Sequence, residues 1–264
     1  MAVLRSQRKV SDTEFENTFM RLYCFSRERT SPVSKRRKRW LCTNIDLTMN
    51  KIYRNIMEIN ECYFRDRTDK QKYVNKLSDS SIELLLSLEK PLMSLWNIQH
   101  YETKTMVHWV TQINKEISLL NLIHDTERSD RVMIIDWRAV HSMKFLNNMS
   151  ALHRYTHGKV TNAAVRYDET EGALLIDLID DAFYSLLKAN KKIPTTKEEY
   201  IVRSKYISHS ISCLKQLNRR MLAYFNLMQY SERVMREWSD MLIEELNLLI
   251  GLQKSDKSRF ENLE

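Results

Sequence analysis

The chain has 264 residues, a net charge of +8, 43% hydrophobic and 29% charged residues, and only 3 glycines and 3 prolines. Hairpins, sandwiches and parallel sheets need more turn residues than this, and phosphate-binding loops need more glycine, so we expect an all-α fold without a nucleotide site. No apolar run approaches a membrane span and the first residues lack the apolar core of a signal peptide, which predicts a cytoplasmic protein with no membrane partner.

The first half of the chain has the pattern of four amphipathic helices. A capping box, Ser11-x-x-Glu14, opens the first helix, and a basic run, Lys35–Arg39, leads into the second. We expect Pro91 to bend the third helix, because its ring lacks a backbone N–H and crowds the preceding turn. The predicted helices span residues 11–29, 35–60, 70–98 and 104–120.

The second half of the chain predicts four more helices. The fifth helix is expected to end at Gly158, and residues 159–170 form the least structured stretch of the interior. A second capping box, Thr196-x-x-Glu199, opens the seventh helix. The predicted helices span residues 134–155, 173–190, 196–228 and 231–253.

The two halves repeat one another. A shift of 129 residues brings identical residues into register without a gap between positions 81 and 120. A period this long exceeds the roughly 20–50 residues of solenoid repeats, so each copy is a complete helical unit. The sequence therefore predicts two tandem antiparallel four-helix bundles, residues 1–128 and 129–264. The repeated residues of the first half are Ser81, Ile82, Leu85, Leu88, Asn97, Tyr101, Met106, Trp109, Glu116, Leu119 and Leu120.

Positive charge is concentrated at the front of the chain. Residues 1–39 hold a net charge of +7, which leaves +1 for the other 225 residues. Adjacent cations repel one another, so such a run is typical of a site that a polyanion or an acidic partner neutralises; a solvated helix start is the plainer alternative. Neighbouring aromatic rings are able to stack on single-stranded bases. The candidate nucleic-acid-binding residues are Arg5, Arg8, Lys9, Lys35, Arg36, Arg37, Lys38, Arg39, Trp40, Arg219 and Arg220.

No constellation of catalytic residues is found in the sequence. His153 and His157 have the spacing of a metal-binding pair, but no glutamate intervenes as in H-E-x-x-H, and Gly158 is expected to end the helix there. Asp180-Asp181 lies in a helical pattern and is interpreted as a solvated edge. The 4 cysteines form no C-x-x-C pair. We therefore expect a protein that is not an enzyme and has no metal site and no cofactor.

Several patterns follow one another in a fixed order along the two halves. They are the basic run Lys35–Arg39; the helix-closing steps Ile59-Asn60 and Ala189-Asn190; the L-x-x-L steps Leu85/Leu88 and Leu214/Leu217; and the acidic-aliphatic steps Glu116-Ile117 and Glu245-Leu246. In this order they resemble the four-helix-bundle accessory proteins of diversity-generating retroelements, the accessory variability determinant (Avd) family, here tandemly duplicated.

The resemblance implies a non-catalytic RNA-binding accessory subunit that assists a separate reverse transcriptase in template-primed cDNA synthesis. Its partners would be that reverse transcriptase and the template RNA, in an oligomer or pseudo-oligomer of bundles. Only Lys159 and Arg166 stand where the second copy would carry the basic run. The alternative is a helical protein scaffold whose basic run binds an acidic partner. Surface residues expected to dock the polymerase are Met143, Met149, Met221 and Tyr224.

Overall fold

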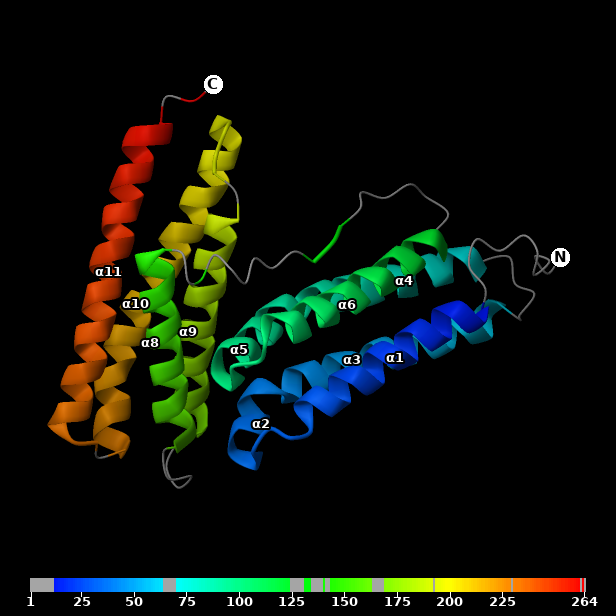
Figure 1. Cartoon of the computed structure of the whole chain (residues 1–264), viewed down its shortest axis with the longest axis horizontal. Helices are drawn as coiled ribbons and strands as arrows, with labels where there is room; N and C mark the ends of the chain where they lie inside the picture. The colour runs from blue at the N-terminus through cyan, green and yellow to red at the C-terminus, as the bar shows by residue number, and fades with distance from the viewer. Residues whose placement is uncertain are drawn as a thin grey trace. The chain divides into compact units, whose positions relative to one another are not determined.

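The chain is helical throughout the part that its structure describes. The computed structural model describes residues 12–63, 70–123, 131–133, 140, 143–162, 169–191, 193–228, 230–261 and 263. Within these ranges all regular structure is α-helix, which confirms the predicted all-α class (Figure 1). No helix in these ranges is both long enough and apolar enough to cross a membrane. The chain divides into a first unit, Met1–Ile135, and a second unit, Asp136–Glu264.

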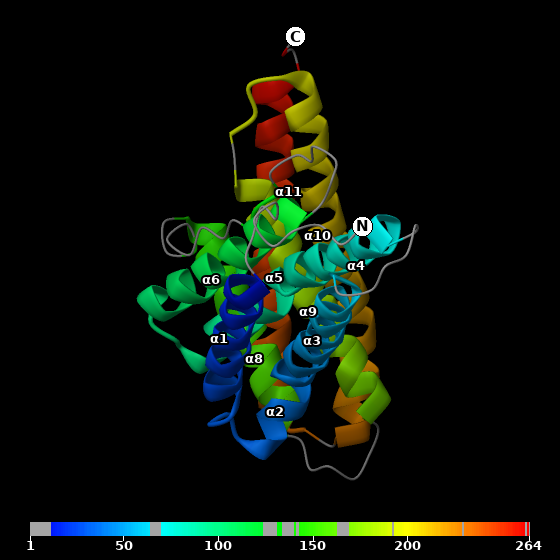
Figure 2. The same ribbon diagram turned by 90° about the vertical axis from the view of Figure 1, so that its right-hand side faces the viewer.

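The first unit packs four helical arms around one apolar core. The arm α1 contacts α3 and α6, and α4 contacts the same two helices, so the arms close into a ring (Figures 1 and 2). Each arm turns an apolar stripe inward. The helices are α1 Asp12–Thr30, α2 Lys35–Leu41, α3 Thr43–Tyr63, α4 Lys70–Ser87, α5 Glu89–Gln99 and α6 Thr103–Ile123. Fully buried core residues include Phe19, Leu22, Ile52, Leu85, Trp109 and Ile113.

Pro91 interrupts the third arm of the first unit, as predicted. The arm breaks at Leu88, between α4 and α5. A proline at position 91 has no N–H to donate to the carbonyl of Ser87, and its ring crowds that turn. The Leu88 N–H bonds the carbonyl of Leu85 at 3.2 Å, one residue closer than in an α-helix. The bend therefore lies within one turn before the proline.

The second unit closes a ring of four long helices. Contacts run from α8 to α9, α9 to α10, α10 to α11 and α11 back to α8. In this unit the third arm is unbroken, because Arg220 stands where the first unit has Pro91. The helices are α8 Lys144–Asn162, α9 Glu169–Asn190, α10 Lys197–Met228 and α11 Glu232–Phe260. Fully buried core residues include Leu146, Leu175, Phe183, Leu214, Met221 and Trp238.

Gly158 lies inside α8, so the prediction that the helix ends there is wrong. A helix-ending glycine takes a positive φ, whereas no described glycine does. Val160 and Thr161 beyond it are buried, and their packing extends the helix. The helix α9 begins at Glu169, earlier than expected. A Cβ at Gly172 would lie 3.0 Å from Val160 Cγ1, so glycine there lets α8 and α9 approach closely.

The two units repeat a buried side-chain contact. Trp109 Nε1 donates to Ser26 Oγ at 3.0 Å, and Trp238 Nε1 donates to Thr156 Oγ1 at 3.0 Å. Both indoles are fully buried. The tryptophans stand 129 residues apart and their acceptors 130, a shift of one residue between the first and last arms. This correspondence supports the interpretation of the repeat as a duplication.

Candidate nucleic-acid interface

The basic run forms a short helix of its own, α2, rather than the start of α3. Cys42 separates the two helices with φ −107° and ψ −24°, and its N–H donates to the carbonyl of Lys38 at 2.9 Å. Leu41 and Cys42 are buried where α2 meets α3 and α5. Burial raises the pKa of the Cys42 thiol to about 12, which makes it an unreactive core residue. The core thus anchors α2 at its C-terminal end.

Positive side chains cover the accessible part of α2. Lys35 and Arg39 are exposed, and Arg37 and Lys38 are half-buried. Lys35, Lys38 and Arg39 share one face, because they stand at positions i, i+3 and i+4. The helix contains no acidic residue, and no carboxylate among the described residues pairs with Lys35, Arg37 or Lys38. Their charge is therefore left for solvent ions or an anionic partner to neutralise.

Trp40 lies beside these cations with its ring half-buried. The guanidinium carbon of Arg39 is 5.4 Å from the centroid of the indole, a cation–π distance. The pair therefore combines a positive charge with a partly accessible aromatic surface. Single-stranded nucleic acids are bound by this combination, because phosphates meet the cation and bases stack on the ring.

The structure brings together only part of the predicted set. Outside the described residues are Arg5, Arg8, Lys9 and the side chain of Arg36. Arg219 is exposed on α10, in the second unit. Arg220 beside it pairs with Glu171, with Nη1 2.9 Å from Oε1, and so links α10 to α9. We therefore restrict the candidate interface to α2 and Trp40.

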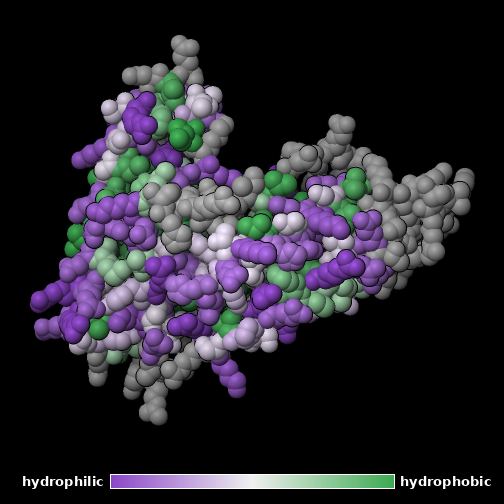
Figure 3. All heavy atoms as spheres, viewed as in Figure 1, coloured by the Kyte–Doolittle hydropathy of each residue, from purple (hydrophilic) through white to green (hydrophobic). Residues whose placement is uncertain are grey.

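The predicted polymerase-docking surface is wrong for three of its four residues. Met143 is 39% exposed, but Met149 and Met221 are fully buried and Tyr224 is 1% exposed. Helical periodicity explains this, because Leu217, Met221 and Tyr224 follow one another at spacings of four and three on the core face of α10. On the face seen in Figure 3, hydrophilic side chains predominate and hydrophobic ones are scattered.

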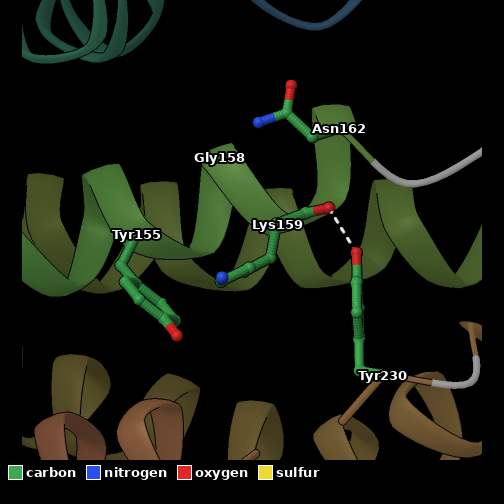
Figure 4. Close-up of a pocket in the computed structure, with 5 residues that line it drawn as sticks. All are labelled: Tyr155, Gly158, Lys159, Asn162 and Tyr230. Atoms are coloured by element: carbon green, nitrogen blue, oxygen red, sulfur yellow. Dashed lines mark hydrogen bonds between the residues drawn. The ribbon is translucent and has the colours of Figure 1, made fainter. Parts of the chain in front are cut away.

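A surface pocket of about 330 Å³ lies along α8 in the second unit. It is lined by Tyr155, Gly158, Lys159, Asn162 and Tyr230 (Figure 4). The Tyr155 and Lys159 side chains point to the same side of α8, and the Lys159 ammonium lies 4.6 Å from the Tyr155 ring centroid. The Tyr230 hydroxyl donates to the Lys159 carbonyl at 2.6 Å.

The first unit contains the same contacts as this pocket. The Tyr101 hydroxyl donates to the carbonyl of Arg29, whose guanidinium lies 5.0 Å from the centroid of the Phe25 ring. These three residues are the repeat equivalents of Tyr230, Lys159 and Tyr155. A contact that recurs in both units fixes helix packing first, so we do not assign a ligand to the pocket.

A cluster of ionisable side chains in the second unit is not expected from the sequence. His153 Nε2 and His157 Nε2 lie 2.8 and 2.7 Å from Asp180 Oδ1, and all three residues are buried. We call them the histidine–aspartate cluster. Burial lowers the pKa of His153 to about 4. Burial acts to raise the pKa of Asp180, but the charge of His157 and hydrogen bonds from both imidazoles outweigh it and hold this pKa well below its usual range.

The interpretation of Asp180 as a solvated edge is wrong. Ile176 and Phe183, one turn to either side of it on α9, are both buried, so their spacing places Asp180 on the core face. This apolar spacing is visible in the sequence. The expected helix end at Gly158 obscures the partner helix, because a helix that stops there leaves His157 in its frayed last residues.

A glutamate is buried at the same position of each unit. Glu116 and Glu245 are 0% exposed, and no described group hydrogen-bonds their carboxyl oxygens. Burial raises the pKa of each to about 8. Both carboxyls are therefore largely protonated at neutral pH. Carboxylates of this kind do not serve a cationic ligand, and we treat them as features of the fold.

Comparisons of the chain with protein-family models, with curated proteins and with solved structures find no match.

Proposed function

We propose that this chain is a non-catalytic RNA-binding subunit that assists a retroelement reverse transcriptase in template-primed cDNA synthesis in the cytoplasm. The observation that carries the proposal is the cationic face of α2, with Lys35, Lys38 and Arg39 beside the half-buried Trp40. The reverse transcriptase as partner, and a diversification system as setting, follow from the resemblance to the accessory variability determinant family.

The mechanism is positioning rather than chemistry. Cations on α2 neutralise phosphates of the template and release condensed counterions, which gives an affinity that falls steeply with salt. Such contacts hold the strand but do not read its sequence. Trp40 adds stacking that tolerates any base. The bound template is thereby presented to the polymerase at a fixed place.

The rival function is a protein scaffold whose basic face binds an acidic partner. Charge alone serves both functions equally well. The aromatic ring beside the cations favours nucleic acid, because stacking on bases gives a partly exposed indole a function that a carboxylate-rich protein surface does not require. We therefore place RNA first.

Binding of single-stranded RNA by the full chain, measured by fluorescence anisotropy at several salt concentrations, tests the proposal. Changing Lys35, Lys38 and Arg39 together to Gln is expected to weaken binding for all sequences alike. The slope of log affinity against log salt should fall by roughly 0.7 for each phosphate that the variant no longer neutralises. Helical content should be unchanged, since none of these three side chains is buried.

A matched control removes the same charge from the second unit. Lys205, Lys215 and Lys254 are all exposed, and their joint change to Gln should leave the salt slope as it is. Equal losses in the two triple variants would mean that RNA responds only to net charge. No RNA binding, together with capture of a polyanionic protein such as polyglutamate, would favour the scaffold.

A further inference from the structure

Three metal-ligating side chains meet in the core of the second unit. His153 and His157 stand one turn apart on α8, and Asp180 faces them from α9. Each side chain offers one ligand atom, and these atoms all lie within 4.8 Å of one another. The donor set is two imidazole nitrogens and one carboxylate, a combination that proteins use for zinc and for other divalent transition metals.

The protein's own groups leave this cluster incomplete. An ionised Asp180 between two neutral imidazoles places a net negative charge in the core, where charge without a counterion is costly. His157 Nδ1 is also buried, and no described group hydrogen-bonds it. A bound divalent cation would neutralise the carboxylate and would use both histidines in their neutral form.

The first unit shows that the bundle does not need ionisable groups at this place. At the equivalent positions the Tyr23 hydroxyl donates to Asn50 Oδ1 at 2.9 Å, a neutral hydrogen bond between the same two arms. Arg27 stands at the third position and pairs with Asp46 at 3.0 Å. One helix contact is thus made in two ways, and only the second unit makes it from residues that ligate metals.

We propose that the histidine–aspartate cluster binds one divalent transition metal, zinc foremost, and that the metal clamps α8 to α9. Zinc–ligand bonds of about 2.1 Å in a tetrahedral site place ligand atoms about 3.4 Å apart, so Nε2 and Oδ1 need to separate by roughly 0.6 Å. Each imidazole keeps one proton, which moves from Nε2 to Nδ1. Burial of all three ligands assigns the metal a structural role.

Metal titration of the full chain tests this site. The protein is stripped with a chelator, dialysed, and titrated with cobalt(II) and with zinc. We expect one metal per chain, a visible cobalt absorption of tetrahedral type that zinc abolishes, and a thermal midpoint that rises on addition of zinc and falls on addition of chelator. Failure of wild type to bind either metal overturns the proposal, whatever the outcome for RNA.

Variants that copy the first unit separate ligation from folding. Changing His153→Tyr together with Asp180→Asn reproduces the Tyr23–Asn50 pair and should give a folded chain that binds no metal. If circular dichroism shows that this variant is unfolded, Asp180→Asn alone removes the anionic ligand at constant shape. His209→Gln, at an exposed histidine of α10, should retain full stoichiometry. Undiminished binding by the folded cluster variants would contradict the assignment.

Discussion

Alanine at Trp109 or at Trp238 is expected to lower the free energy of unfolding by about 3–5 kcal/mol in each case. Each indole is fully buried, and its N–H donates to a buried hydroxyl, Ser26 or Thr156. Truncation leaves a large cavity and an unpartnered hydroxyl in the core. Urea unfolding followed by circular dichroism measures the loss without relying on tryptophan fluorescence.

The two losses should be alike, because the tryptophans occupy equivalent environments in the two units. Trp40→Ala is the matched control, since that indole is half-buried on a surface helix and its loss should cost less than about 1 kcal/mol. A large loss at one buried tryptophan and none at the other would argue against the duplication.

Stability is expected to fall between about pH 4.5 and pH 8 because of the two buried glutamates. In the unfolded chain Glu116 and Glu245 ionise near their ordinary pKa of 4.5, whereas burial raises the pKa of each to about 8 in the folded chain. Between these values the folded state binds more protons, so the free energy of unfolding decreases as pH rises. Each glutamate contributes a slope of up to about 1.4 kcal/mol per pH unit.

The comparison that isolates this effect is the double change of Glu116 and Glu245 to Gln, which keeps side-chain shape and removes titration. Between about pH 5.5 and 7.5 the wild type should lose on the order of 3 to 5 kcal/mol relative to this variant. Above about pH 8 the difference should become constant, because both states are then ionised. Parallel curves for the two proteins across the whole range would show that the carboxyls are ionised in the folded state.

Helical periodicity and composition suffice to predict most of the fold. Apolar residues at helical spacing locate the long arms, and Pro91 locates the break in one of them. The same rules fail at Gly158, where the packing of Val160 overrides the tendency of glycine to end a helix. They also fail at Cys42, because a break between two helices without glycine or proline has no sequence signature.

The candidate sites are predictable to different degrees. The basic face of α2 is visible in the sequence, because a run of cations needs no partner to be recognised. The histidine–aspartate cluster is not, because its members come from two helices and a single sequence does not say which faces meet. Residue type alone assigns Asp180 to the surface, although its apolar neighbours place it inside.

Mapping of ultraviolet cross-links between the full chain and single-stranded RNA tests the central claim most directly. Digestion at glutamate is suitable, because the segment around Lys35–Trp40 is free of acidic residues and stays on one peptide for mass spectrometry. The account predicts cross-links concentrated on this peptide and their loss when Lys35, Lys38 and Arg39 are changed to Gln. Cross-links confined to the second unit, or none at any salt concentration, would contradict it.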